Sequence, residues 1–279
     1  MRNFIVYFFI AVLPLWINAQ NFDYATEKSL FYYGANEENI SNYQREKCLL
    51  DVYYPKTTKK VPVVVWYHGG GLTGGAREVP EALKNKGYVI VGVGYRLSPY
   101  VKAEVCIADA AAALAWVFKN IGSFNGDPSA VFVSGHSAGG YLALMSVLDK
   151  SQLEKHTIDA NIVAGLVPFS GHTITHFTIR EEQGIPGEQP IIDKWAPLFY
   201  VRGDAPATLL ITGDRELEML GRYEENAYFY RMMKNSGQKD ITLYEMQGYG
   251  HNMTYPAFPL LLNFVAEKTK KKINLSTKY

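Results

Sequence analysis

Short, unbroken hydrophobic runs alternate with longer segments of helical periodicity after residue 20. Residues 61–67, 88–93 and 162–169 are such runs, and each predicts a buried strand. Residues 103–120 are rich in alanine and predict a helix. Strands that are buried on both faces and alternate with helices are typical of a mostly parallel sheet with helices on both sides. We therefore predict a single α/β domain over residues 20–279.

One segment departs from this regular alternation. Residues 171–200 lack clear periodicity and carry Gly184, Pro186, Gly187 and Pro190. A long irregular segment inside a compact domain is often a lid or a binding loop. We expect residues 171–200 to shape a substrate pocket.

The remaining patterns complete the expected alternation. Further strands are predicted over 48–54, 130–133, 207–212 and 241–246, and helices over 79–86, 139–149, 221–236 and 258–268.

The N-terminus has the pattern of a secretory signal peptide. A short charged start, Met1-Arg2-Asn3, precedes an apolar run from Phe4 to Ile17 and the small residue Ala19. We expect cleavage after Ala19, so that the mature protein is periplasmic or secreted. The run is too short for a stable transmembrane span, although an uncleaved anchor is the alternative.

Charge and cysteine content bear on the binding partners and on disulfide bonds. The formal net charge is +1, which gives no bias toward nucleic acid or anionic membranes. The two cysteines, Cys48 and Cys106, lie in apolar surroundings, and we expect two buried free thiols rather than a disulfide. No group of His, Cys, Asp and Glu has metal-ligand spacing, and we expect neither a metal nor a cofactor.

A serine lies in a glycine-flanked turn directly after a hydrophobic strand. The sequence is Gly135-His136-Ser137-Ala138-Gly139, and a predicted helix follows it. Strand, sharp turn and helix expose a serine hydroxyl at the end of a sheet, and the helix directs its positive end toward a developing oxyanion. Ser137 is therefore the candidate nucleophile.

A second glycine-rich segment closes the strand at 61–67. In His68-Gly69-Gly70-Gly71, the amides of Gly70 and Gly71 can approach a carbonyl oxygen closely. Together with the Ala138 amide they would form an oxyanion hole. A phosphate-binding loop is the alternative, but the segment lacks the Lys-Ser/Thr ending of a P-loop and the spacing of a dinucleotide fingerprint.

A serine nucleophile needs a general base and an acid that orients the base. His251 follows the strand at 241–246 and fits the chain order nucleophile, acid, histidine. Asp214, Glu216 and Glu218 follow the strand at 207–212 and compete as the acid. The usual position, three residues beyond Gly213, favours Glu216. Other charged residues in well-patterned segments are expected to have structural roles: Arg96, Asp109 and Asp127.

The two motifs, His-Gly-Gly-Gly at 68–71 and Gly-His-Ser-Ala-Gly-Gly at 135–140, resemble those of the hormone-sensitive-lipase-like carboxylesterases, a group of α/β-hydrolases. Segment 94–99 supports this resemblance, and 193–219 resembles the strand-and-acid segment of secreted bacterial esterases. The members most similar in pattern include feruloyl and acetyl xylan esterases. The resemblance implies an α/β-hydrolase fold with Ser137 as nucleophile, His251 as base and Glu216 as acid, where many members have Asp. It also implies an oxyanion hole formed by Gly70, Gly71 and Ala138.

The motifs and the resemblance lead to one functional hypothesis with alternatives. We predict an exported serine carboxylesterase for short-chain or aromatic acyl esters. Acetyl or feruloyl groups on plant polysaccharide are the favoured substrates on the resemblance alone. The alternatives are a serine peptidase or amidase on the same fold, and a catalytically silent ligand-binding homologue.

Overall fold

The computed structural model describes residues 22–34, 40–219 and 221–276, so the expected signal peptide lies outside the described residues. The fold is built on one eight-stranded sheet in the order β1-β2-β4-β3-β5-β6-β7-β8. The six strands β3 to β8 run parallel to one another. Strand β2 runs antiparallel to its neighbours β1 and β4. The strands are β1 (Tyr24–Phe31), β2 (Leu49–Pro55), β3 (Val61–Tyr67), β4 (Val89–Val93), β5 (Gly126–His136), β6 (Gly165–Phe169), β7 (Thr208–Gly213) and β8 (Ile241–Met246).

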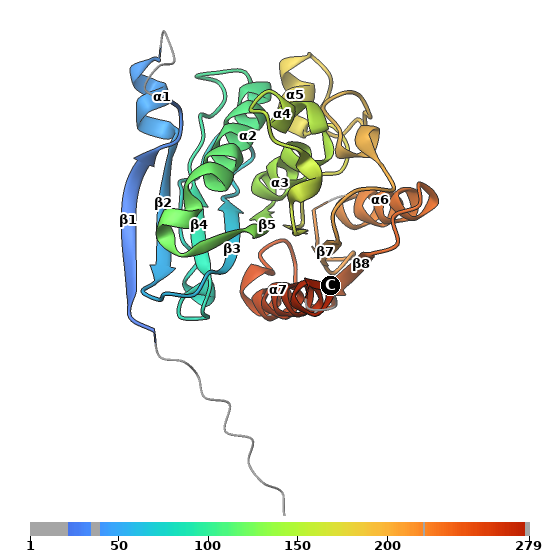
Figure 1. Ribbon diagram of the computed structural model, residues 1–279. Helices are drawn as coiled ribbons and strands as arrows, with labels where there is room; N and C mark the ends of the chain where they lie inside the picture. The colour runs from blue at the N-terminus through green and yellow to red at the C-terminus, as the bar shows by residue number, and fades with distance from the viewer. Residues whose placement is uncertain (1–21, 35–39, 220, 277–279) are drawn as a thin grey trace, which may run out of the picture.

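Helices cover both faces of this sheet (Figure 1). The α-helices are α1 (Asn42–Lys47), α2 (Ala103–Asn120), α3 (Ala138–Leu148), α4 (Lys150–Glu154), α5 (Phe177–Glu182), α6 (Arg222–Asn235) and α7 (Thr254–Ser276). Short 3₁₀ turns are η1 (Glu81–Leu83), η2 (Ile121–Phe124), η3 (Ala160–Ile162) and η4 (Pro197–Tyr200).

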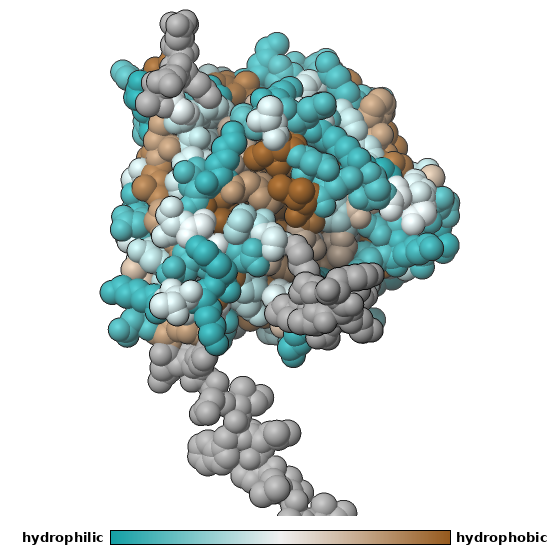
Figure 2. All heavy atoms as spheres, in the orientation of Figure 1, coloured by the Kyte–Doolittle hydropathy of each residue, from teal (hydrophilic) through white to brown (hydrophobic). Residues whose placement is uncertain are grey.

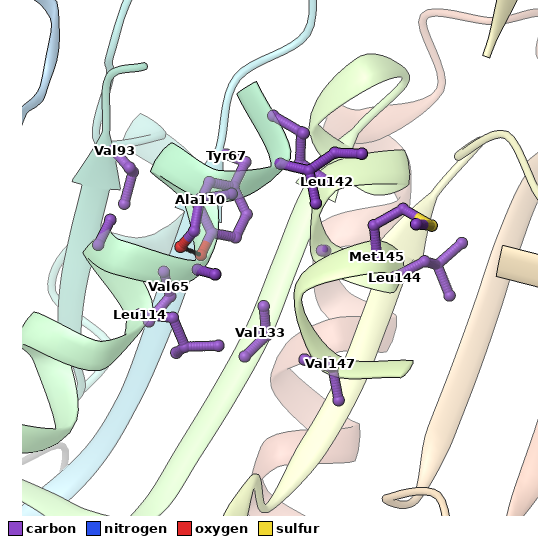
Figure 3. Packing of buried hydrophobic residues seen from close by; sticks show 14 of the residues in the cluster. Val65, Tyr67, Val93, Ala110, Leu114, Val133, Leu142, Leu144, Met145 and Val147 are labelled. Atoms are coloured by element: carbon purple, nitrogen blue, oxygen red, sulfur yellow. Dashed lines mark hydrogen bonds between the residues drawn. The ribbon is translucent and has the colours of Figure 1, made fainter. Parts of the chain in front are cut away.

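Two hydrophobic cores lie on opposite faces of the sheet. The larger core packs α2, α3 and α6 against one face, and side chains such as Val65, Val133 and Leu142 meet there (Figure 3). The smaller core packs α7 against the other face through residues such as Phe258 and Leu261. Alternate side chains of a strand point to opposite faces, so a strand with a core on each face must be apolar throughout. That requirement explains the unbroken hydrophobic runs in the sequence.

The predicted α/β architecture is confirmed, and most predicted elements lie where the hydrophobic pattern places them. Residues 61–67, 103–120 and 241–246 coincide with β3, α2 and β8. The predicted helix at 79–86 is wrong, because only the single turn η1 forms there. The irregular segment 171–200 contains the short helix α5 and the turn η4.

The edge strand β1 and the helix α1 are absent from the sequence-based prediction. β1 has exposed or half-exposed residues along its whole length. An edge strand without a buried face gives no hydrophobic alternation to detect. α1 has only six residues, too few to show a helical period.

The apolar helix α2 is a core element. Within the described part of the chain, Ala103–Phe124 is the stretch long and apolar enough to cross a membrane, but most of it is buried inside the molecule. Figure 2 shows that hydrophilic side chains cover most of one face of the molecule, around a smaller hydrophobic area near its middle.

Cys48 and Cys106 are both buried and free, as the sequence predicts. The Cys48 thiol donates a hydrogen bond to the buried carboxylate of Asp109 over 3.4 Å. The Cys106 thiol donates to the carbonyl of Arg96 over 3.0 Å.

Candidate active site

Ser137 lies in a tight turn between β5 and α3, at the carboxyl end of the parallel strands. Its backbone adopts φ 56°, which is unfavourable for a residue with a side chain, and its amide donates to the carbonyl of Phe169 over 2.8 Å. A Cβ added to Gly139 would lie 2.0 Å from the Tyr67 carbonyl oxygen, and one on Gly135 would lie 2.5 Å from the Gly139 backbone. Glycine is therefore required at both positions, because the backbone segments lie too close together for a side chain. The tight turn that results exposes Ser137 at the end of the sheet.

His251 lies in the loop between β8 and α7 and contacts Ser137 directly. Its Nε2 is 2.9 Å from Ser137 Oγ, and its Nδ1 is 2.5 Å from Glu218 Oε1. Because an ionised carboxylate only accepts hydrogen bonds, Nδ1 donates to Glu218 and the neutral Nε2 accepts from the serine hydroxyl. The Nε2 of His136 is 2.8 Å from the His251 carbonyl oxygen, so His136 holds the base through its backbone.

The acid partner of His251 is Glu218, and the prediction of Glu216 is wrong. The Glu218 side chain is fully buried, whereas Glu216 is exposed to solvent. Besides His251, the Glu218 carboxylate accepts the amides of Gly213 at 3.0 Å and Met219 at 2.9 Å and the hydroxyl of Ser170.

The chain after β7 explains why the later glutamate reaches His251. The amides of Leu217 and Glu218 both donate to the Asp214 carbonyl, at 2.9 and 2.7 Å, which forms one helical turn. This turn brings Glu218 back over the end of the strand and directs Glu216 outward. Asp214 stabilises the turn, because its carboxylate accepts the amides of Glu216 at 3.0 Å and Gly248 at 2.8 Å.

The surroundings of Glu218 stabilise its ionised form. Burial alone would raise the pKa of the carboxyl group. The hydrogen bonds from His251, Ser170 and the Met219 amide outweigh that effect and lower the pKa of Glu218 to about 2. A carboxylate of this kind remains charged at neutral pH and can stabilise a protonated imidazole.

The predicted oxyanion-hole segment lies beside the serine. A Cβ on Gly69 would be 3.5 Å from Ser137 Cβ. Gly70 and Gly71 adopt φ of 117° and 64°, and the Gly74 amide donates to the Gly70 carbonyl over 2.9 Å. Ala138 is the first residue of α3.

The three predicted amides are available to a ligand. Among the described residues, no group accepts a hydrogen bond from the amides of Gly70, Gly71 or Ala138. Free backbone donors that meet beside a nucleophile are suited to bind an oxyanion.

A pocket of about 710 Å³ is lined by residues that adjoin the oxyanion segment and Glu218. Phe177 lines it, and this ring would be 3.2 Å from a Cβ on Gly71. Met219, the residue after Glu218, also lines it. Several other lining residues belong to the segment 171–200, including Ile174, Arg180 and Pro190.

The wall of this pocket contains a buried ionic cluster that the sequence analysis did not single out. Arg222 Nε lies 2.8 Å from Glu225 Oε1, and the same carboxylate oxygen lies 2.8 Å from His172 Nδ1. Arg222 Nη2 is 2.8 Å from His172 Nε2, so this imidazole accepts at Nε2 and donates from Nδ1. Burial lowers the pKa of His172, which is consistent with a neutral ring. The separation of Arg222 and Glu225 by three residues in a predicted helix could have indicated their ion pair in the sequence.

The other charged residues lie in structural interactions. The Asp109 carboxylate is fully buried and accepts hydrogen bonds from Arg96 through Nε at 2.9 Å and Nη2 at 2.6 Å. Asp127 accepts the amide of Ser129 at 2.8 Å in a turn. Over the described ranges, no group of three or more His, Cys, Asp or Glu side chains is arranged to hold a metal ion.

Comparison with known proteins places this geometry in a family. The family model BD-FAE matches residues 50–219, which is more than half of the chain. The chain belongs to the BD-FAE family. Carboxylesterase 1E of Rattus norvegicus is 36% identical to this BD-FAE member over 152 residues, 47% of this chain and 27% of that protein. The chain thus spans about a quarter of the length of that relative.

Solved structures confirm the α/β-hydrolase fold. A truncated carbohydrate esterase from gut microbiota superposes with a TM-score of 0.71 at 17% identity, over 89% of this chain and 97% of that one. Esterase B from Lactobacillus rhamnosis superposes with a TM-score of 0.72 at 19% identity, over 92% of this chain and 90% of that one.

Proposed function

We propose that this BD-FAE member is a serine ester hydrolase that acts through an acyl-enzyme. One observation carries the proposal: Ser137 Oγ, the two nitrogens of His251 and Glu218 Oε1 form a continuous hydrogen-bonded chain, with separations of 2.9 and 2.5 Å. This chain is the arrangement that activates a serine hydroxyl as a nucleophile.

The mechanism follows from the positions of these groups. Ser137 attacks the ester carbonyl while His251 Nε2 takes its proton, and the Glu218 carboxylate stabilises the resulting imidazolium. The free amides of Gly70, Gly71 and Ala138 bind the negative oxygen of the tetrahedral intermediate. His251 then gives its proton to the departing alcohol. Water, activated by the same histidine, releases the acyl group from Ser137.

The test compares the wild type with Ser137→Ala on p-nitrophenyl acetate. We expect the variant to lower kcat by at least about three orders of magnitude. Circular dichroism and the melting temperature show whether the fold is kept. Labelling by a fluorophosphonate probe, with the modified residue located by mass spectrometry, gives a second readout. Unchanged turnover in Ser137→Ala, or the absence of label on Ser137, would overturn the proposal.

For the substrate, we propose short-chain or aromatic acyl esters, with acetyl or feruloyl groups on plant polysaccharide as the favoured case. Two observations support this proposal. The pocket of about 710 Å³ is lined by the apolar side chains of Phe177, Ile174 and Met219, of which Phe177 lies close to Gly71 and Met219 follows Glu218, and one structural neighbour is a carbohydrate esterase. A panel of acetylated xylan, methyl ferulate and p-nitrophenyl esters of increasing chain length tests it. Faster hydrolysis of long-chain esters than of all other panel members would contradict it.

We also propose that the protein is exported and cleaved after Ala19. The charged start, apolar run and small residue before the cleavage position support this proposal. N-terminal sequencing of the protein from the medium or periplasm should begin at Gln20. An intact N-terminus in the soluble protein would contradict cleavage.

A further inference from the structure

Ser170 lies at the carboxyl end of β6 and directs its hydroxyl group at the acid of the site. It is fully buried, and its Oγ donates a hydrogen bond to Glu218 Oε2. The Ser170 amide donates to the Ile211 carbonyl over 2.7 Å. The backbone has φ 48°, the left-handed region that costs a non-glycine residue about 1 kcal/mol or more.

The Ser170 hydroxyl holds the carboxylate from a strand that is neither next to Glu218 in the chain nor the source of the base. Glu218 Oε1 accepts from His251 and the Met219 amide, and Oε2 accepts from Ser170 and the Gly213 amide. The Met219 amide belongs to the residue next to Glu218, and the Gly213 amide lies at the end of β7, the strand that leads into the turn of Glu218. Ser170 directly follows β6, a central strand that is hydrogen-bonded to β5, the strand that leads to Ser137.

The backbone of Ser170 is fixed in turn by the ionic cluster of the pocket wall. Arg222 Nη1 donates to the Ser170 carbonyl, and Arg222 is held by Glu225 over 2.8 Å. The Ser170 backbone is thus held at its amide by Ile211 and at its carbonyl by Arg222. A hydroxyl group fixed in this way can restrict the glutamate side chain, which has more rotatable bonds than an aspartate.

We propose that Ser170 is a positioning residue that holds the Glu218 carboxylate against His251. The proposal rests on the proposed function, because it acts through the same acid. It adds a fourth side chain to Ser137, His251 and Glu218. The same hydrogen bond contributes to the low pKa of Glu218, since it stabilises the charged carboxylate.

Ser170→Gly is the sharpest test, because glycine removes the hydroxyl and adopts φ 48° without strain. We expect kcat on p-nitrophenyl acetate, and the rate of Ser137 labelling by the fluorophosphonate probe, to fall about tenfold or more with little change in KM. Ser170→Ala should lose the same activity but melt at a lower temperature than Ser170→Gly. Ser146→Ala, which alters another fully buried serine that donates to the Ala143 carbonyl, is the matched control and should label at the wild-type rate.

A double-mutant cycle separates positioning from a structural role. If Ser170 acts through the carboxylate, Ser170→Gly in a Glu218→Gln background should change the labelling rate less than about twofold. A wild-type labelling rate in Ser170→Gly, or the same tenfold loss in both backgrounds, would overturn the proposal. Failure of the wild type itself to label at Ser137 would instead overturn the proposed function.

Discussion

At the residue scale, the identity of the acid shows how a single turn decides the chemistry. Asp214, Glu216 and Glu218 all follow β7, and their spacing alone favoured Glu216. The hydrogen bonds of the Leu217 and Glu218 amides to the Asp214 carbonyl make that segment helical, so the residue four positions after Asp214 returns to the site. From there the Glu218 side chain reaches His251.

Exchange of Glu218 for glutamine keeps the shape of the side chain and removes its charge. We expect Glu218→Gln to lower kcat on p-nitrophenyl acetate by about three to four orders of magnitude, because the imidazolium loses its partner and the histidine its orientation. Glu216→Gln, the matched control on the exposed side of the same turn, should stay within about twofold of the wild type. A larger loss in Glu216→Gln than in Glu218→Gln would reverse the assignment.

At the element scale, the turn between β5 and α3 depends on backbone atoms that nearly touch. The first turn of α3 packs against the end of β3, where Gly139 faces the Tyr67 carbonyl. This contact holds the N-terminus of the helix beside the oxyanion segment and sets the strained conformation of Ser137. The Gly-x-Ser-x-Gly pattern therefore predicted the local structure correctly because its glycines satisfy a steric requirement.

Gly139→Ala tests that requirement. The new Cβ would lie 2.0 Å from a backbone oxygen, which cannot move without displacing β3. We expect the free energy of unfolding to fall by about 3 kcal/mol or more in urea titrations. Gly184→Ala is the comparison. Gly184 has φ 74°, which strains an alanine, but no atom lies within 4 Å of the added Cβ, so this variant should lose only about 1 kcal/mol. Equal losses in the two variants would show that close packing does not govern this turn.

At the scale of the whole molecule, one parallel sheet gathers residues that are far apart in the chain. Ser137 follows β5, Glu218 follows β7 and His251 follows β8, and the carboxyl ends of parallel strands lie at one edge (Figure 1). The site is thus coupled to global stability, because its buried ionic contacts form only in the folded chain.

This coupling predicts a pH dependence of stability. The pKa of Glu218 is lowered from about 4.5 to about 2 in the folded protein. A lowered carboxyl pKa stabilises the fold above the unfolded value, and that contribution is lost as pH falls from about 5 toward 2. We expect the wild type to lose on the order of 2 kcal/mol more than Glu218→Gln over this range, measured by urea unfolding at several pH values. Parallel curves for the two proteins would contradict the prediction.

The two thiols report on the integrity of the larger core. Cys48 and Cys106 are fully buried, and burial raises the pKa of both thiols. We expect no reaction with Ellman's reagent within minutes in the native protein, and two reactive thiols per chain after denaturation. A reducing agent should leave the melting temperature unchanged, because neither thiol is in a disulfide. Rapid native reaction at either residue would show that the core opens.

The sequence by itself determined the α/β class, the strands with two buried faces, and the turn that exposes Ser137. Each is encoded by neighbouring residues: unbroken apolar runs, or glycines at fixed offsets from the serine. The chain order nucleophile, acid, histidine also predicted His251 as the base. The edge strand β1 was not predicted, because none of its residues is fully buried and its burial shows no alternation.

Only the tertiary structure decided which carboxylate meets His251. It also brought Ser170 to Glu218 and Arg222 to Ser170, from separate elements of the chain. Those contacts depend on where a turn places a side chain in space and on which strands are neighbours in the sheet. Local hydrophobic patterns carry neither kind of information, because a hydrogen bond across the sheet joins residues whose separation along the chain is arbitrary.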